Sequence, residues 1–251
     1  MKSLILQLIR GILNRLPYQV ARQILNLWLE SLATSPNAKA RLTQLLELDS
    51  DLTNWINQAA VRYGDGLHVK HRLMRYHDFF VERVQPGDRV LDIGCGQGAL
   101  AYDVAAQAKA TVTGIDINAA NIAYAQQHYQ HPKLHFIAGD ALQYEFSEPF
   151  DVVILSNVLE HIDARVPFLR SLQAKLKPRC LLIRIPAIDR DWRVPLRAEL
   201  GLFHFCDITH YTEYTQQSFQ EELAAVDLAP THLQVNWGEI WAEVSVKNLS
   251  V

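Results

Sequence analysis

The 251-residue sequence predicts a doubly wound α/β fold, in which a mostly parallel sheet carries helices on both faces and follows a helical segment. From residue 89 onward, strand-like runs alternate with helical ones, which is the pattern of βαβ units. Runs such as "RVLDIG" and "FDVVILSN" have apolar centres rich in Val, Ile and Leu, as in strands that are buried on both faces of a sheet. The glycine-rich turn "GCGQG" follows the first run directly, at a place where such sheets bind ligands.

The first part of the chain has helical spacing only. We expect helices over 3–15, 18–33 and 38–48, separated by Pro17 and "TSPN", and a further helix over 68–84 that ends at "QPGD". This pattern predicts a helical extension over residues 1–60 and the α/β domain over 61–251.

The remaining strands of the α/β domain are predicted from their β-branched, apolar runs. They are "TVTGIDI", "LHFIAGD", "CLLIRIP" and two late strands within "THLQVNWGEIWAEVSV", the last two forming a hairpin-like edge. A long irregular stretch over 187–215 separates the fifth strand from the last helix.

Composition and charge restrict the class of protein. Hydrophobic residues make up 49% of the chain and charged residues 20%, which is ordinary for a soluble globular protein. A net charge of −3 argues against a nucleic-acid partner. Cys95, Cys180 and Cys206 lack metal-ligand spacing, so we expect free thiols, a cytoplasmic location and no bound metal.

The first helix is amphipathic, and two interpretations of it are open. Its apolar stripe consists of Leu4, Leu8, Ile12 and Leu16. The basic residues Lys2, Arg10 and Arg15 lie off that stripe. The helix packs onto the rest of the protein, or it rests on a membrane surface as a basic interfacial helix. No run approaches the 18 apolar residues that a membrane-spanning helix needs.

The glycine turn restricts the ligand. "GCGQG" is one residue shorter than the dinucleotide fingerprint G-x-G-x-x-G, and no G-K-[ST] follows it, which excludes a P-loop. A tight turn at a helix N-terminus favours a carboxylate. Asp92, at the preceding strand end, would repel a pyrophosphate but suits an ammonium group. A ligand with both groups is an amino acid.

Two further acidic residues indicate additional groups on this ligand. Asp116 ends the second strand, where a carboxylate can accept both hydroxyls of a ribose. Asp140 ends the third strand and can accept from an adenine amine. The three strand-end carboxylates therefore predict a ligand composed of an amino acid, a ribose and a base.

The motifs "VLDIGCGQG", "VTGIDIN", "IAGDA" and "FDVVILSNVLEHI", in this order, resemble those of class I S-adenosylmethionine-dependent methyltransferases. The resemblance is strong over about residues 86–185. It implies a seven-stranded sheet with an antiparallel last pairing and S-adenosylmethionine as the cofactor. It also implies a set of cofactor-binding residues: Asp92, Gly94, Cys95, Gly96, Gly98, Asp116, Ile117, Asp140, Ala141 and Asn157.

Candidate catalytic residues follow the fourth and fifth strands. Transfer to a hydroxyl is helped by a general base, and histidine is the usual one near neutral pH. Glu160 and His161 stand in "NVLEHI", at the expected acceptor side, although they could equally be solvated or capping residues. His210 and Tyr211 stand in "HFCDITHYTEY", within the segment that commonly forms the acceptor pocket in this family.

Candidate substrate-binding residues also occur in "GLHVKHRLMRYHDFF". His68, His71 and Arg75 are expected to share one helix side opposite the apolar face, as a lid or as a solvated basic face. With Tyr211 they complete the predicted substrate-binding set.

We predict O-methylation of a small-molecule or glycan-type acceptor. Methylation of a lipid-linked or quinone-like acceptor at a membrane surface is the alternative, which the amphipathic N-terminus suits. A non-catalytic binding protein with the same fold is the third hypothesis.

Overall fold

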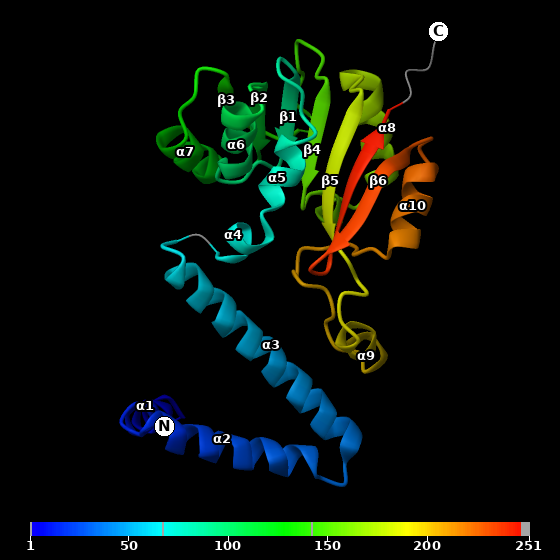
Figure 1. Ribbon diagram of the computed structural model, residues 1–251. Helices are drawn as coiled ribbons and strands as arrows, with labels where there is room; N and C mark the ends of the chain where they lie inside the picture. Colours follow the sequence, from blue (N-terminus) through cyan, green and yellow to red (C-terminus); the bar gives the residue numbers. More distant parts are fainter. Residues whose placement is uncertain (1, 67, 142, 247–251) are drawn as a thin grey trace. The chain divides into compact units, whose positions relative to one another are not determined.

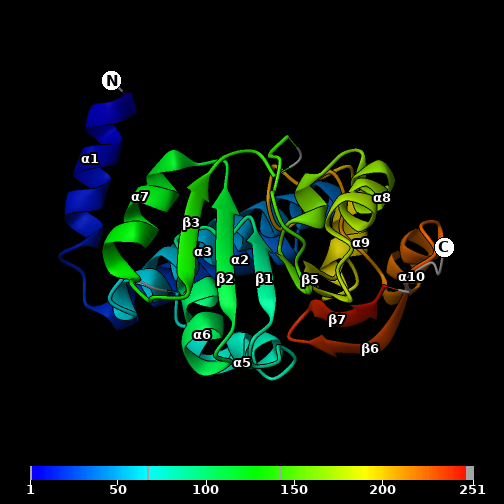
Figure 2. The same cartoon turned by 90° about the horizontal axis from the view of Figure 1, so that it is seen from above.

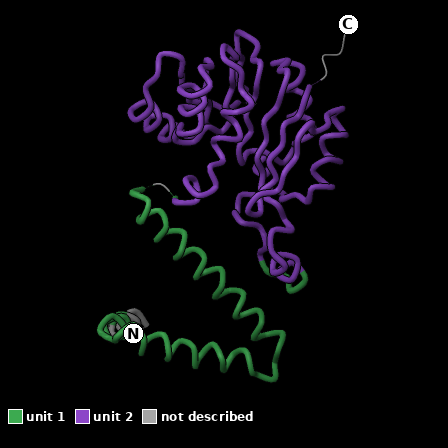
Figure 3. Tube along the Cα trace, viewed as in Figure 1, with its two compact units in different colours: residues 1–68, 199–202 green, residues 69–198, 203–251 purple. Residues whose placement is uncertain are grey.

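The computed structural model describes residues 2–66, 68–141 and 143–246, and it divides into two compact units (Figure 3). The first unit comprises Met1–His68 with Glu199–Leu202, and the second comprises Val69–Ala198 with Phe203–Val251. Residue 60 lies inside a helix of the first unit. The division into 1–60 and 61–251 stays a prediction.

The first unit contains the helices α1 (Lys2–Leu13), α2 (Tyr18–Ala33) and α3 (Ala38–Tyr63). The side chain of Asn37 accepts from the Ala40 amide and caps α3, which ends at Gly64. The predicted end of this helix at residue 48 is wrong, because no breaker interrupts the chain before Gly64. The side chains of Leu4 and Leu8 in the predicted stripe lie outside the described part of the structure.

The second unit is built on a seven-stranded sheet of order β3-β2-β1-β4-β5-β7-β6 (Figures 1 and 2). The strands are β1 (Arg89–Ile93), β2 (Thr111–Asp116), β3 (Leu134–Ala138), β4 (Val152–Ser156), β5 (Cys180–Pro186), β6 (Ala229–Asn236) and β7 (Glu239–Ser245). The first five are parallel, and β7 runs antiparallel to both β5 and β6. The predicted fold class is confirmed.

Helices cover both faces of this sheet. The remaining helices are α4 (Lys70–Met74), α5 (Tyr76–Val81), α6 (Ala99–Gln107), α7 (Ala119–His128), the 3-10 turn η1 (Leu159–His161), α8 (Arg165–Leu176), α9 (Arg193–Glu199) and α10 (Gln216–Ala224).

Alternation along the strands produces two cores. Leu91, Val153 and Leu155 belong to the core that includes α8 and α10, whereas Val90 and Ile154 belong to the one that includes α5 and α6. Successive side chains of a strand point to opposite faces, which explains the continuous apolar runs of the sequence.

The predicted single helix over 68–84 is wrong. Arg75 has φ 50°, ψ 37°, a left-handed conformation that an α-helix cannot propagate, and it separates α4 from α5. Leu73 of α4 is exposed, whereas Phe80 of α5 is fully buried. His71 and Arg75 therefore do not share the side of one continuous helix.

None of the helices in the described residues combines the length and apolar character that a membrane crossing requires.

Candidate functional site

The glycine turn connects β1 to α6 at the carboxyl end of the parallel strands. Gly94, Gly96 and Gly98 all have positive φ, at 67°, 54° and 86°, so three left-handed steps fold the turn tightly. The amides of Gly94 and Cys95 both donate to the Ile115 carbonyl of β2, at 2.8 and 3.1 Å. The turn is therefore fixed to the neighbouring strand.

Two of these glycines are also required by space. A Cβ on Gly98 would lie 2.6 Å from Phe136 Cζ and 2.8 Å from Ala125 Cβ, and one on Gly94 would lie 2.9 Å from Val158 Cγ2. Each distance is too short for carbon atoms in contact. The "GCGQG" pattern thus meets both a conformational and a packing requirement.

Asp116, at the end of β2, holds the turn and the following loop. Its Oδ2 accepts from the Gly96 amide and its Oδ1 from the Asn118 amide, both at 2.8 Å. Each carboxylate oxygen can accept a second hydrogen bond. Oδ1 also accepts from Asn121 Nδ2 at 3.5 Å, so the side chain is oriented by the backbone and by Asn121, and Oδ2 retains acceptor capacity for a hydroxyl.

A cavity of about 370 Å³ opens beside these residues. Six of the ten predicted cofactor residues line it, with His161 beside them: Gly94, Asp116, Ile117, Asp140, Ala141 and Asn157. Four do not line it: Asp92, Cys95, Gly96 and Gly98. The strand ends thus form one concave site of the size expected for a small ligand.

Two buried oxygens at the strand ends have no hydrogen-bond partner among the described residues, Asp92 Oδ2 and Asn157 Oδ1. Burial, followed by the charge of Asp116, raises the pKa of Asp92 to about 8. An unpaired buried carboxylate is costly unless a cationic donor reaches it. These orphaned acceptors fit the ammonium group of a methionine moiety, as the sequence predicts.

Asn157 has a left-handed backbone, with φ 57°, directly after β4. Its amide donates to the Arg184 carbonyl of β5 at 2.7 Å, which holds this conformation. Such outliers cost roughly 1–3 kcal/mol and are retained where the surroundings enforce them, often at functional sites.

Cys95 is a buried thiol beside the turn. Burial, with smaller effects from Asp92 and Asp116, raises its pKa well above the ordinary value. It is therefore not a nucleophile at neutral pH.

Glu160 and His161 form η1 after β4, at the other side of the cavity. Glu160 is fully buried, and neither of its carboxylate oxygens has a partner among the described residues. Burial raises the pKa of Glu160 to about 8. Its carbonyl accepts from the Tyr211 amide at 2.8 Å, which ties η1 to the segment after β5.

The structure brings His161 and His210 together, although 49 positions separate them in the sequence. Their ring centroids lie 4.6 Å apart at an interplanar angle of 78°. Burial, followed by the neighbouring His210, lowers the pKa of His161. His161 is therefore the neutral, proton-accepting form at neutral pH.

Glu213 orients His210 and was missed in the sequence. Its fully buried side chain accepts from His210 Nδ1 at 2.9 Å and from the Cys206 amide, and it pairs with Arg190. The spacing His210-x-x-Glu213 within "HYTEY" is the signal that could have indicated this contact.

Two overlapping groups in the described residues offer atoms that a metal ion could bind. Glu160, His161 and His210 form one, and Cys206, His210 and Glu213 form the other, each with ligand atoms within 4.8 Å of one another. The absence of a metal stays a prediction.

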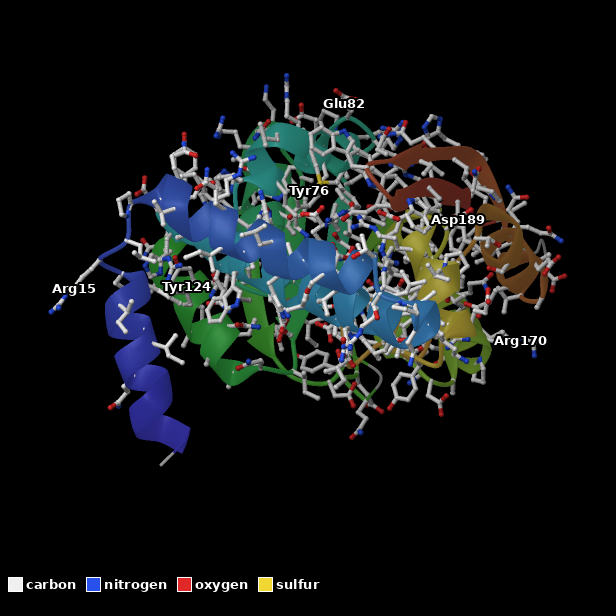
Figure 4. The ribbon with its side chains drawn as sticks, turned by 90° about the horizontal axis from the view of Figure 1, so that it is seen from below. Arg15, Tyr76, Glu82, Tyr124, Arg170 and Asp189 are labelled. Atoms are coloured by element: carbon white, nitrogen blue, oxygen red, sulfur yellow. The ribbon has the colours of Figure 1, made fainter. Side chains whose placement is uncertain are left out.

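The predicted substrate-binding residues are scattered. Tyr211 follows His210 and is exposed, and Arg75 pairs with Asp78 at 2.5 Å on the surface of α5. His71 contacts the hydroxyl of Tyr76 through Nδ1 at 2.8 Å (Tyr76 is marked in Figure 4). His68 belongs to the first unit, where its Nε2 contacts Asn57 Oδ1 at 3.2 Å.

Residues 90–179 match the family model of a methyltransferase domain. The ubiquinone biosynthesis O-methyltransferase of Pseudomonas entomophila (strain L48) is 40% identical over 125 residues, 48% of this chain and 53% of that protein. The protein of the same name from Pseudomonas fluorescens (strain Pf0-1) is 40% identical over 102 residues, 39% of this chain and 44% of that protein. The chain thus spans about half the length of these curated relatives.

Among solved structures, magnesium protoporphyrin IX methyltransferase from Synechocystis PCC 6803, with bound SAH, is similar at a TM-score of 0.57 and 20% identity. The similarity covers 72% of this chain and 85% of that one, and at this identity it supports the fold alone. The fold, the pocket at the strand ends and the match over residues 90–179 show that this part of the chain is a methyltransferase domain with the class I fold, for which S-adenosylmethionine is the cofactor.

Proposed function

We propose that this protein methylates a hydroxyl oxygen of a quinone-like aromatic acceptor. One observation carries the proposal: His161, neutral at neutral pH, lines the cofactor cavity beside a second histidine, His210. A phenolic hydroxyl loses its proton more readily than an alcohol, so a single histidine suffices as its base. The names of the partial relatives favour the same acceptor class.

The cofactor, when bound, supplies an electrophilic methyl group on a sulfonium sulfur. Asp92 and Asn157, whose buried oxygens have no partner among the described residues, would hold its ammonium group, and Asp116 would hold the ribose hydroxyls. Asp140 and Ala141, which also line the cavity, would flank the adenine. Positioning of this kind contributes up to roughly 7–11 kcal/mol to a bimolecular transfer.

His161 takes the proton of the acceptor hydroxyl as the oxygen attacks the methyl carbon. Glu160 lies beneath it with a raised pKa and is protonated through most of the neutral range, so it adds no full negative charge there. Tyr211, exposed next to His210, offers an aromatic surface for a flat acceptor.

The test is turnover with a radiolabelled methyl donor and a matched pair of acceptors, an ortho-dihydroxy aromatic and a monosaccharide. We expect label in the aromatic acceptor and its loss with His161→Gln. Label in the sugar alone would return the assignment to a glycan-type acceptor. Donor binding without label in any acceptor would favour a non-catalytic binding protein.

We also propose that the N-terminal helices rest on an anionic lipid surface. Large apolar side chains are exposed along one side of α3, Leu52, Trp55, Ile56 and Tyr63, and around α2, Tyr18, Val20, Ile24, Leu25, Leu27 and Trp28. Exposed apolar stripes of this extent mark interaction surfaces.

Charge favours lipid over a second protein. Residues 1–29 contain Lys2, Arg10, Arg15 and Arg22 and no acidic residue, in a chain whose net charge is −3. Arg15, marked in Figure 4, points away from the neighbouring helices. Each basic residue near an anionic surface contributes about 1 kcal/mol to binding.

Co-sedimentation of the full chain with vesicles tests this surface. We expect binding to vesicles that contain phosphatidylserine, weaker binding to phosphatidylcholine alone, and loss of binding with Ile24→Gln/Trp28→Gln. Trp192→Gln, which changes an exposed tryptophan of the second unit, is the control. Equal binding to both vesicle types, or concentration-dependent dimers that the double variant abolishes, would contradict the proposal.

A further inference from the structure

Thr209 lies between His161 and an acidic side chain. Its hydroxyl Oγ1 is 2.9 Å from His161 Nδ1 and 2.6 Å from Asp207 Oδ1. The three side chains therefore form a hydrogen-bonded chain in the order Asp207, Thr209, His161, and His161 is the general base proposed above. The inference drawn from it rests on that proposed function.

The direction of each hydrogen bond between these side chains follows from donor counting. A threonine hydroxyl has one hydrogen to donate, and an ionised carboxylate can only accept. Asp207 Oδ1 also accepts from the Thr209 backbone amide, at 2.8 Å. The Thr209 hydroxyl and amide hold the pKa of Asp207 below its ordinary value, so the carboxylate is ionised at neutral pH.

The hydroxyl hydrogen is therefore committed to Asp207, and Oγ1 is left as an acceptor toward His161. Only a hydrogen on Nδ1 can fill the 2.9 Å contact. We propose that the Asp207–Thr209 pair is a positioning device that holds His161 as its Nδ1–H tautomer, which leaves Nε2 with a free lone pair. Which ring nitrogen of a histidine carries the proton is set by the partner of the other one.

This tautomer gives the proposed reaction a consistent proton path. The acceptor oxygen forms its bond to the methyl carbon as the electron pair of the breaking carbon–sulfur bond stays on sulfur. The hydroxyl proton passes to His161 Nε2, and the resulting imidazolium keeps its Nδ1–H bond to Thr209. No further oxidant, reductant or base is required.

His210 provides an internal comparison. Its Nδ1 contacts the Glu213 carboxylate directly, at 2.9 Å, whereas a hydroxyl separates His161 from Asp207. Both rings are thus held through Nδ1. The intervening hydroxyl fixes the orientation of His161 without placing a full charge against it.

The direct test determines which ring nitrogen of His161 carries the proton. Long-range ¹H–¹⁵N NMR of the full chain with labelled histidine distinguishes the two forms, and His161→Gln identifies the signals of residue 161. We expect the Nδ1–H form in the unsubstituted protein and in Thr209→Ser, which keeps the hydroxyl. Thr209→Val should produce a mixture of both forms. An Nε2–H form in the unsubstituted protein, or a Thr209→Val spectrum unchanged from it, would overturn the inference.

Kinetics provides the second readout. Thr209→Val should lower kcat in proportion to the fraction of His161 that leaves the Nδ1–H form, with an unchanged KM for S-adenosylmethionine, and Thr209→Ser should restore kcat. Equal loss in both variants would indicate a merely structural role and contradict the proposal. If no hydroxyl acceptor is methylated at all, the proposed function fails, whereas the NMR experiment still decides the tautomer.

Discussion

The site has a cofactor half, formed by the glycine turn and the strand ends, and an acceptor half, formed by η1 and residues 203–214. The two halves differ in how their side chains are held. On the cofactor half, Asp92 and Asn157 keep buried oxygens that no described residue satisfies. On the acceptor half, the buried Glu160 carboxylate is also without a partner among the described residues, but His161 and His210 are bonded to side chains of the segment after β5. Strand geometry therefore organises the first half, and a side-chain network organises the second. Substitutions in the two halves should have different consequences.

The largest effect is expected in the cofactor half, from Gly98→Ala. An alanine there would be strained by the left-handed backbone and would also clash with Phe136 and Ala125. The two costs are additive, so the free energy of unfolding should fall by about 2–6 kcal/mol. Gly87→Ala is the matched control, because Gly87 has φ 92° but open space around its Cβ position. Urea unfolding measures both. Equal losses in the two variants would show that packing at Gly98 is unimportant.

His161→Gln should separate the two halves most clearly. Loss of a general base lowers kcat by roughly 10²–10⁴-fold. Calorimetry should give unchanged S-adenosylmethionine affinity, because the cofactor contacts stay intact. His135→Gln, an exposed histidine of β3, serves as the control and should retain full turnover. Comparable losses of affinity and kcat with His161→Gln would mean that the halves are not independent.

Asp92→Asn should weaken S-adenosylmethionine binding by about 10- to 100-fold, the value of one hydrogen bond between charged groups. The turnover rate at saturating cofactor should change less. Isothermal titration calorimetry measures the affinity, and an unchanged dissociation constant would remove Asp92 from the binding site.

The same variant predicts a pH dependence of stability. The pKa of Asp92 is about 8 when folded against an ordinary 3.8, so the folded state keeps a proton that the unfolded chain releases. The stability due to this group is complete below pH 4 and is lost as pH rises toward 8. The stability of Asp92→Asn relative to the unsubstituted protein should therefore increase from pH 5 to pH 8 in thermal unfolding. A constant difference would contradict the raised pKa.

The smallest effect is expected from Cys206→Ala in the acceptor half. Cys206 is exposed as a residue, but desolvation of its sulfur, followed by the Glu213 contact, raises the pKa of Cys206 to about 12, so it is not a thiolate at neutral pH. We expect turnover within about twofold of the unsubstituted protein. A large loss would give Cys206 a role beside His210.

Six of the ten cofactor residues predicted from the sequence line one cavity, because the features that select them are local. A strand, three glycines and an acidic residue at each strand end are consecutive features, and the sheet order then brings them together. The break at Arg75 was not predictable, since nothing in "HRLMRYHD" departs from helical spacing and a left-handed arginine has no sequence signature.

The acceptor half was predicted only as separate residues. His161 and His210 were both selected, but their contact depends on how the segment after β5 folds back over η1. The contacts of Thr209 with His161 and of Glu213 with His210 depend on the same folding of the segment. Sequence periodicity does not predict such side-chain hydrogen bonds. Long-range side-chain pairing of this kind is visible only in three dimensions.

The segment 203–214 supplies almost all side chains of the acceptor half besides η1, and the hydrogen bonds of Glu213 hold it in place. None of these side chains belongs to the strand ends that bind the methyl donor. A family built on this arrangement can exchange one short stretch of chain and acquire a new acceptor while its donor chemistry stays the same. On the acceptor site proposed above, 203–214 is the stretch to replace when a different acceptor is wanted.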